Sequence, residues 1–134
     1  MTETTIMAEL LVTIDGPAAS GKSTLARLLA ERLGAVFLDT GAMYRAVTLA
    51  AMQAKAELSN EGQLLEVLKD TKFNFETKVG LMKIFIDGLD VTEQIRNENV
   101  TANARYIASA PKIRQRLVRM QRDFAGKQRS IVTE

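Results

Sequence analysis

The stretch of residues 11–25 constrains the fold of this chain more than any other part of it. It opens with a short apolar run, which is typical of a buried parallel strand. Residues 16–23, GPAASGKS, then match the phosphate-binding pattern G-x-x-x-x-G-K-[ST]. Apolar residues return behind this pattern at helical spacing, at Leu25, Leu28, Leu29 and Leu33. The sequence therefore predicts a strand, a glycine-rich loop and a helix, in that order.

This loop has the chemistry of an anion site. Glycine lets the backbone bend so that successive N–H groups face inward, and the following helix adds the partial positive charge of its N-terminus. Lys22 adds a full charge for the β- and γ-phosphates of a nucleotide, and the hydroxyl of Ser23 is a predicted Mg²⁺ ligand. The alternative is a glycine-rich turn that holds no ligand. The strand before the motif and the helix behind it favour phosphate binding.

Composition restricts the remaining chemistry. The chain has 134 residues, of which 46% are hydrophobic and 25% charged, and this is enough for one soluble domain with a core. It has neither cysteine nor histidine, so disulfides, thiolate metal sites and imidazole catalysis are excluded. The net charge of +2 gives no case for a nucleic-acid partner.

Targeting signals are absent from the sequence. Residues 1–9 lack the basic start and apolar middle of a signal peptide, and no apolar run reaches the length needed to span a membrane. We therefore predict a cytoplasmic protein without a membrane partner, and we expect a monomer.

Two kinds of strand are predicted. Residues 35–39 form a second apolar run and residues 130–134 begin a third, as expected for parallel strands. Residues 73–77 and 82–86 instead alternate between apolar and polar, with turns at 78–80 and at Asp87-Gly88, as in an antiparallel sheet. Because a parallel sheet usually has more than three strands, we expect this chain to be the first part of a longer domain.

Helices are predicted where apolar residues recur three or four positions apart between capping residues. Apart from the first, which ends near Leu33, they cover residues 41–54, the stretch after Asn60, residues 97–108 and the stretch from Pro111 to Gly126. The capping signals are Gly34 for the end of the first helix, Thr40 as an N-cap, Asn60 with Gln63 as a capping box, and Pro111 at a first helical position. The last helix is expected to turn four apolar side chains inward, those of Ile113, Leu117, Met120 and Phe124.

Further candidate ligands follow the second strand in DTGAMYR, residues 39–45. The guanidinium of Arg45 matches the geometry of a phosphate group, Thr40 offers a hydroxyl at a helix N-terminus, and Tyr44 offers an aromatic face with a polar tip. The alternative for Arg45 is a surface charge on a helix.

The last helix is basic, with Lys112, Arg114, Arg116, Arg119 and Arg122. Two interpretations compete: a solvated helix face, or a row of cations aimed at phosphate groups. We favour one or two functional arginines. Arg114 is the first candidate, because it adjoins the apolar Ile113 near the start of the helix and can border a cleft. The role of Arg105, on the preceding helix, stays undecided.

At this point the residues resemble a known family. IDGPAASGKSTLARLLAERL followed by LDTGAMYRAV closely resembles the bacterial cytidylate kinases, which transfer a phosphoryl group from ATP to CMP or dCMP. FIDGLDVTEQIR looks like part of that family's enlarged monophosphate-binding lobe, and IASAPKIRQRLVRMQRDF resembles the helix after it. The resemblance covers residues 10–134. Adenylate kinases share the loop, but they usually carry Thr-Gly-Asp-x-Leu-Arg after the second strand and lack the hairpin.

The resemblance implies an α/β fold of the P-loop nucleoside monophosphate kinase type. This is a three-layer α/β/α arrangement whose parallel sheet is incomplete here, with a small antiparallel β insert. It implies three segments: residues 1–57 as the first half of the P-loop core, 58–110 as the monophosphate-binding lobe, and 111–134 as a return helix with the start of the next core strand.

The resemblance also implies roles for individual residues. ATP is expected to contact Gly16, Pro17, Ala18, Ala19, Ser20, Gly21, Lys22, Ser23 and Thr24, with Ser23 next to Mg²⁺. CMP is expected to contact Thr40, Tyr44, Arg45 and Arg114. Lys22 and Arg45 are the expected catalytic residues. Arg105 stands where many relatives have serine or another small polar residue, so a base-contacting hydroxyl is not expected there.

The implied reaction is phosphoryl transfer from ATP to CMP or dCMP, giving CDP or dCDP, in the intact protein. The family continues with Gly-Arg-Asp and an arginine-rich lid after a residue like Glu134, so we expect the 134-residue chain to be inactive. The alternatives are another P-loop kinase for AMP, UMP or shikimate, a non-catalytic nucleotide-binding fragment, and a nucleic-acid-binding module that uses the basic helix.

Overall fold

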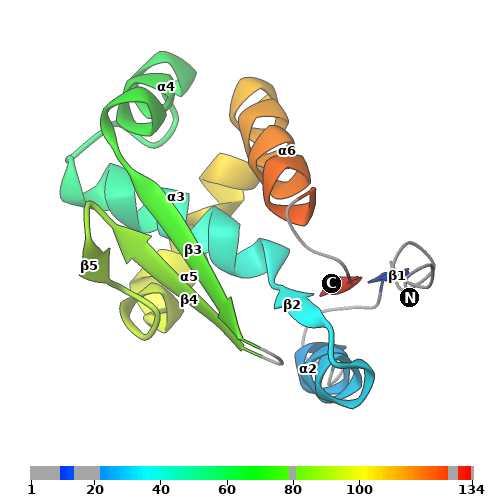
Figure 1. Cartoon of the computed structure of the whole chain (residues 1–134). Helices are drawn as coiled ribbons and strands as arrows, with labels where there is room; N and C mark the ends of the chain where they lie inside the picture. Colours follow the sequence, from blue (N-terminus) through cyan, green and yellow to red (C-terminus); the bar gives the residue numbers. More distant parts are fainter. Residues whose placement is uncertain (1–9, 14–21, 79–80, 127–129, 134) are drawn as a thin grey trace. The chain divides into compact units, whose positions relative to one another are not determined.

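The described part of the chain contains both helices and strands (Figure 1). The computed structural model describes residues 10–13, 22–78, 81–126 and 130–133. In chain order the elements are β1 (Leu10–Thr13), α2 (Lys22–Leu33), β2 (Val36–Leu38), α3 (Thr40–Gln53), α4 (Glu61–Asp70), β3 (Phe73–Lys78), β4 (Leu81–Ile86), β5 (Leu89–Asp90), a 3₁₀ turn (Gln94–Arg96), α5 (Glu98–Ala108), α6 (Pro111–Ala125) and β6 (Ser130–Thr133). None of these helices is long and apolar enough to cross a membrane.

The chain divides into two units. The first comprises Met1–Thr40, Thr77–Met82 and Arg122–Glu134, and the second comprises Gly41–Glu76 and Lys83–Gln121. The predicted α/β class and the small antiparallel sheet are confirmed.

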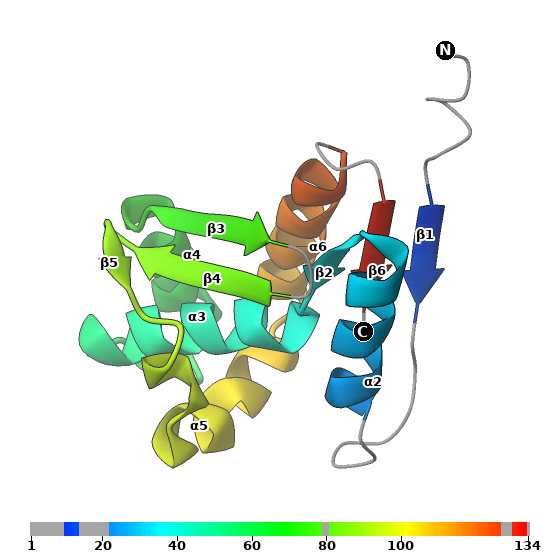
Figure 2. The ribbon, with the colours of Figure 1, turned by 60° about the horizontal axis from the view of Figure 1, so that its bottom comes forward.

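A three-stranded parallel sheet forms the centre of the first unit. Its order is β1-β6-β2, so the last strand of the chain lies between the two strands that come first (Figure 2). Leu10 pairs with Ser130 and Val36 with Ile131, and both pairings run in parallel. The strand predicted from residue 130 onward is therefore present and pairs in the predicted direction.

Helix α2 packs against β2 and β6 through small residues. Ala26 and Ala30 are fully buried against Ala35 and Phe37, and Leu29 joins this group from its edge. Alanines on the packed face let the helix lie close to the sheet, because their side chains add little bulk. The predicted leucine stripe behaves differently: three of its four members, Leu25, Leu28 and Leu33, are 58%, 53% and 44% exposed.

The predicted caps of the first two helices have different outcomes. Gly34 has φ +63° at the end of α2, as the predicted C-cap requires. Helix α3 begins at Thr40 itself, one residue earlier than predicted, so Thr40 is the first helical residue and Asp39 precedes the helix. Helix ends commonly shift by one or two residues in this way.

Helix α3 is the central helix of the second unit. The antiparallel sheet lies along one side of it and α5 along the other (Figure 2). The helix has eight buried residues, and among them are the four predicted to share a side, Met43, Val47, Ala50 and Ala51. Its one buried polar side chain, that of Thr48, donates a hydrogen bond to the carbonyl oxygen of Tyr44 at 2.7 Å, so its burial leaves no hydroxyl unsatisfied.

The antiparallel sheet has the order β3-β4-β5 and shows the predicted alternation. Met82, Ile84 and Ile86 on β4 are buried, whereas Lys83 between them is exposed. β4 and β5 are joined at Asp87-Gly88, where both residues have positive φ (49° and 85°). A two-residue turn of this conformation matches the right-handed twist of the strands that it joins, so the predicted turn is confirmed.

The remaining helices close the core of the second unit. The side chain of Asn60 accepts a hydrogen bond from the backbone N–H of Gln63 at 3.1 Å, which confirms one half of the capping box. The other half differs, because the Gln63 side chain accepts from the N–H of Glu57 at 2.8 Å instead of returning to Asn60. Helix α6 begins at Pro111 as predicted. Its inward-facing residues Ile113 and Leu117 have no exposed surface.

Candidate functional site

The carboxyl ends of the three parallel strands meet at one edge of the first unit's sheet. Thr13 pairs with Thr133, and Leu38 pairs with the same Thr133 from the other side, so the three strands end at one level. Strands β1 and β2 are two positions apart, which places their ends about 10 Å from each other at the usual strand spacing. Ligands of open parallel sheets bind at this edge.

In the sequence, the phosphate-binding motif lies between the end of β1 and the start of α2. Six of its predicted ATP-contacting residues lie outside the described part of the chain: Gly16, Pro17, Ala18, Ala19, Ser20 and Gly21. The described helix α2 begins at Lys22, so Lys22, Ser23 and Thr24 occupy its first turn. The first N–H groups of a helix have no acceptor within the helix and carry its partial positive charge. The strand and the helix that the motif requires are thus both present.

Two further polar residues follow β2 at the same edge. Asp39 comes directly after the strand and is only 6% exposed, and Thr40 is half-buried. Among the described residues, Asp39 and Thr48 are the two polar residues that are buried. The structure therefore places the predicted ligand Thr40 at the sheet edge where β1 also ends.

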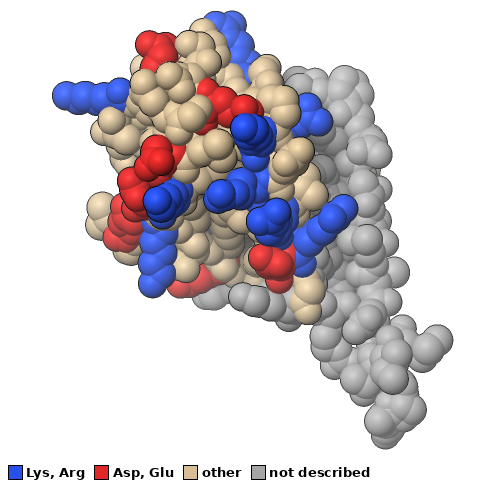
Figure 3. All heavy atoms as spheres, turned by 90° about the horizontal axis from the view of Figure 1, so that it is seen from above, with Lys and Arg blue, Asp and Glu red and all other residues tan. Residues whose placement is uncertain are grey.

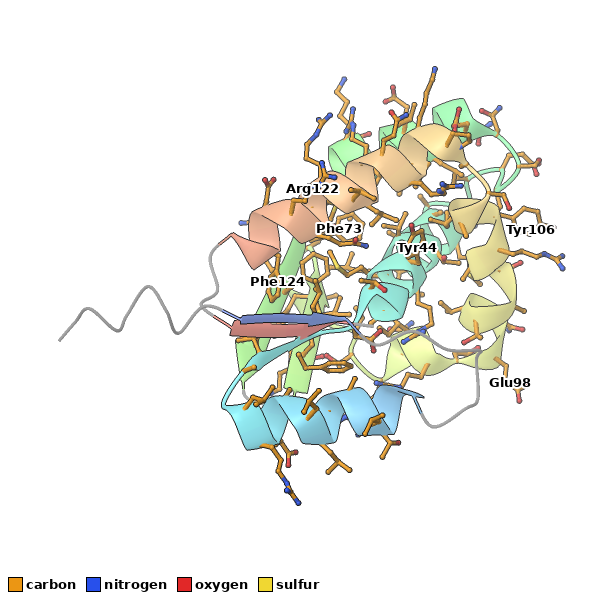
Figure 4. The ribbon with its side chains drawn as sticks, turned by 90° about the vertical axis from the view of Figure 1, so that its right-hand side faces the viewer. Tyr44, Phe73, Glu98, Tyr106, Arg122 and Phe124 are labelled. Atoms are coloured by element: carbon orange, nitrogen blue, oxygen red, sulfur yellow. The ribbon has the colours of Figure 1, made fainter. Side chains whose placement is uncertain are left out.

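Tyr44 and Arg45 lie in the second turn of α3, in the second unit. Both are half-buried, and the Nε atom of Arg45 is shielded from solvent. Figure 4 shows Tyr44 projecting from this helix. Because they share a helix whose opposite side is packed, these two side chains are held by a rigid element. Partial burial favours the ligand interpretation of Arg45 over that of a freely solvated surface charge.

Arg114 lies in the first turn of α6, and its backbone N–H donates to the carbonyl of Ala110 at 2.9 Å. Its side chain is exposed, although the preceding Ile113 is completely buried. Arg114 thus borders the packed face of the helix, and its place beside a cleft stays a prediction.

The other cations of α6 in the second unit, Lys112, Arg116 and Arg119, are also exposed, and Figure 3 looks onto the surface where such side chains gather. The backbone N–H of Lys112 donates to the carboxylate of Glu61 on α4 at 2.9 Å. This carboxylate lies beside the basic residues and reduces their combined field. The arrangement favours a solvated face for most of these charges, as the sequence pattern indicated.

Arg105 is exposed on α5 and interacts with its neighbour Tyr106. The guanidinium carbon lies 5.0 Å from the centre of the tyrosine ring, and one of its nitrogens donates to the phenol oxygen at 3.2 Å. Figure 4 labels Tyr106 on α5. The structure thus gives Arg105 a cation–π partner.

A pocket that the sequence did not predict lies in the second unit. It has a volume of about 520 Å³ and is lined by residues 55–59 together with Gln63, Asn103 and Tyr106. None of the predicted site residues that the structure describes lines it. Three separate segments form this pocket, and no local sequence pattern marks such a meeting point.

Metal-binding side chains do not gather in the described part of the chain. No group of three or more aspartate or glutamate residues there is arranged to hold a metal ion.

Strand, phosphate-binding motif and helix together define a P-loop nucleotide-binding protein. Comparison with known proteins narrows this class. The family model described as cytidylate kinase matches residues 12–134. Curated cytidylate kinases of Bacillus thuringiensis (strain Al Hakam), Bacillus cereus (strain AH187) and Bacillus anthracis (strain A0248) are each 43% identical to this chain over 116 residues, which is 87% of the chain and 52% of each relative.

The chain belongs to the cytidylate kinase family. It spans about half the length of the curated relatives that it matches.

Proposed function

We propose that this sequence supplies the ATP phosphate site and part of the monophosphate site of an enzyme that transfers the γ-phosphoryl group of MgATP to CMP or dCMP. The observation that carries the proposal is the match of the family model to residues 12–134, which include both the P-loop motif and Arg45. The products are CDP or dCDP, and ADP.

Residues at the start of α2 hold the donor in this proposal. The N–H groups of the loop and of the first helical turn donate to phosphate oxygens, and Lys22 neutralises charge that builds up during transfer. Ser23 and Thr24 belong to the first turn of α2, and a serine hydroxyl is a hard oxygen donor of the kind that Mg²⁺ prefers. When bound, Mg²⁺ would supply charge neutralisation at the phosphates, and Ser23 would be the residue that helps to hold it. Residues 16–21 are proposed to make the remaining contacts to ATP.

The acceptor is held by Thr40, Tyr44, Arg45 and Arg114. Arg45 binds the 5′-phosphate of CMP through its forked guanidinium, and Thr40 donates its hydroxyl at a helix N-terminus. The attacking atom is an oxygen of a phosphate that is already ionised, so the reaction needs no general base. Catalysis then consists of alignment and charge neutralisation, which side chains on rigid helices provide.

Several features of the whole enzyme belong to this proposal. They are the three-layer P-loop kinase fold, the segments 1–57, 58–110 and 111–134, a cytoplasmic location and a monomeric state. Because the chain spans half the length of its relatives, we expect the 134 residues alone to show little or no turnover.

The test uses a chimera in which residues 12–134 replace the matching part of the Bacillus cereus cytidylate kinase. ADP release is measured with CMP, dCMP, UMP and AMP as acceptors. We expect the chimera to be active with CMP and dCMP. Turnover dependent on AMP instead, or hydrolysis of ATP that CMP does not stimulate, contradicts the proposal.

Two substitutions in the chimera separate the donor and acceptor sites. Lys22→Ala should lower kcat, because several kcal/mol of transition-state stabilisation are lost. Arg45→Ala should mainly weaken the binding of CMP, by about 2–5 kcal/mol for a partly desolvated charge pair. Arg116→Ala, at an exposed arginine of α6, is the matched control and should leave both parameters unchanged. Wild-type affinity for CMP in Arg45→Ala removes Arg45 from the site.

A further inference from the structure

The pocket of the second unit lies where the connection between α3 and α4 meets α5. Its volume of about 520 Å³ is within the range of about 300–1,000 Å³ that small-molecule sites usually have. Its walls come from this connection, from the first turn of α4 and from α5. Six of the eight lining residues are polar: Lys55, Glu57, Ser59, Gln63, Asn103 and Tyr106. Such a lining suits a polar ligand.

Two amide side chains in the lining are held by hydrogen bonds that use one end of each amide. The amide nitrogen of Asn103 donates to the carbonyl oxygen of Asn99 at 2.9 Å and to the sulfur of Met52 at 3.8 Å, so its oxygen remains as an acceptor. The amide oxygen of Gln63 accepts from the backbone N–H of Glu57 at 2.8 Å, so its nitrogen remains as a donor. One acceptor and one donor are what the polar edge of a nucleobase requires.

An aromatic ring belongs to the same lining. Tyr106 is half-buried and follows Asn103 by three residues, so the two side chains are neighbours on one side of α5. The guanidinium of Arg105 lies over the ring and donates to the phenol oxygen, and these contacts hold the ring in place. Bases stack on aromatic side chains of this kind, because every base has a flat π face.

The connection between α3 and α4 adds one ammonium group and one carboxylate. Lys55 is exposed and has no ion-pair partner in the described part of the chain. The carboxylate of Glu57 accepts a hydrogen bond from the hydroxyl of Ser59 at 3.1 Å, which leaves it further acceptor capacity. A single ammonium group matches a single phosphate group, and nucleotide-binding proteins use a carboxylate to accept a ribose hydroxyl.

We propose that this pocket is a second nucleotide site, which takes a nucleoside monophosphate and is separate from the P-loop and from Arg45. The base stacks on Tyr106 and pairs its edge with the amides of Asn103 and Gln63. Glu57 accepts a ribose hydroxyl, and Lys55 holds the phosphate.

The experiment uses the two tyrosines of the chain, Tyr44 and Tyr106, as separate reporters. Labelling with 3-fluorotyrosine gives each a fluorine resonance, and Tyr44→Phe assigns them. The chain is titrated with CMP, UMP, AMP and GMP, and with inorganic phosphate as the reference. We expect at least one nucleotide to shift the Tyr106 resonance saturably and to bind roughly tenfold more tightly than phosphate. The absence of a Tyr106 shift with all four nucleotides overturns the proposal, and so does an equal shift with phosphate alone.

Two substitutions test the lining and leave the fold intact. Lys55→Gly removes the ammonium group at a position with φ +56°, where glycine is the favoured residue, so lost affinity does not reflect unfolding. Gln63→Glu keeps the oxygen that accepts from Glu57 but replaces the donor. Each should raise the dissociation constant roughly tenfold. Lys69→Ala, at an exposed lysine of α4 outside the lining, is the control and should not change it. Wild-type affinity in either pocket variant overturns the proposal.

The substitution Arg45→Ala separates this pocket from the proposed acceptor site. Arg45 and Gln53, the last residue of α3, are eight positions apart, which is about 12 Å along the helix axis. The response of Tyr44 to CMP should therefore disappear, whereas the response of Tyr106 should remain. Loss of both responses together indicates a single site and overturns the proposal. Binding is measured without turnover, so this test and the kinase assay of the chimera fail independently.

Discussion

Two helices of this chain end in the same backbone motif but with different residues at its critical position. At the end of α2, Gly34 has φ +63°. Its N–H donates to the carbonyl of Glu31 at 3.2 Å, and the N–H of Ala35 donates to the carbonyl of Ala30 at 2.8 Å. These two bonds define a Schellman motif, which satisfies carbonyl groups that the helix itself leaves free.

Helix α3 ends in the same way with a lysine. Lys55 has φ +56°, its N–H donates to the carbonyl of Met52 at 3.0 Å, and the N–H of Ala56 donates to the carbonyl of Ala51 at 3.0 Å. A residue with a Cβ in this left-handed conformation costs about 1–2 kcal/mol. The protein therefore holds backbone strain at Lys55 that it avoids at Gly34.

The substitution Lys55→Gly should release this strain. Glycine loses about 0.5–1 kcal/mol more than other residues through backbone entropy. Subtracting this from a strain of about 1–2 kcal/mol leaves a net stabilisation of about 0–1.5 kcal/mol. Lys55 is exposed, so loss of its side chain removes little packing. The converse change, Gly34→Lys, should destabilise by about the same amount, because a Cβ at Gly34 meets no atom within 4 Å and only the backbone term remains.

Urea unfolding followed by far-UV circular dichroism measures both variants. Each midpoint should move by a few tenths of a molar, in opposite directions and with an unchanged slope. If both substitutions shift the midpoint in the same direction, or if Lys55→Gly destabilises the protein, left-handed strain is not what distinguishes the two helix ends. A changed slope would instead indicate an altered unfolded state.

Three further predictions concern stability. Leu117→Ala should cost about 2–5 kcal/mol in urea unfolding, because Leu117 has no exposed surface, whereas Val118→Ala at the next, 37% exposed position should stay within about 0.5 kcal/mol. Asn60→Ala should lower the free energy of unfolding by about 1 kcal/mol, since the N-cap bond of α4 is lost. Hydrogen bonds from the side chain and backbone of Thr92 hold the pKa of Asp90 below its ordinary value of 3.8, so the carboxylate stabilises the fold above that pH and this contribution disappears as the pH falls through the lower folded-state pKa. The difference in midpoint between the wild type and Asp90→Asn should accordingly be largest near neutral pH and close in acid; a difference that persists in strong acid contradicts it.

Local signals allowed much of the fold to be predicted. The start of α6 at Pro111, the turn at Asp87-Gly88 and the N-cap at Asn60 each depend on the conformational preference of one or two residues. Such preferences act through neighbours in sequence, and a pattern of a few letters captures them. The same reasoning identified the phosphate-binding motif, whose flanking strand and helix are both present.

Long-range features were beyond this kind of reasoning. The sequence indicated that β6 is parallel, but not that it lies between β1 and β2, because strand order depends on how distant segments pack. The helical spacing of the leucines on α2 was correct, yet spacing alone does not tell which side of a helix meets the sheet. The pocket lined by Asn103 and Tyr106 likewise comes from segments that meet only in the fold.

The distribution of acidic residues at helix starts separates two groups of helices. Helices α4 and α5 have Glu61 and Glu98 in their first turns, where a carboxylate offsets the positive end of the helix. Helices α2, α3 and α6 have no acidic residue in the first turn.

These same three helices carry, in their first two turns, every described residue of the proposed ATP site and acceptor site. A helix start without a carboxylate keeps its N–H groups and its partial charge for an external anion, whereas a glutamate there would compete with it. In the unbound protein, each of these helices lacks the stabilisation of a few tenths to about 1 kcal/mol that a carboxylate in its first turn would provide. This arrangement is expected where nucleotide phosphates supply the negative charge, and it supports the proposed placement of Arg114 on α6. At α3 the carboxylate of Asp39 directly precedes the first helical residue, so the argument does not extend to Thr40 and Arg45.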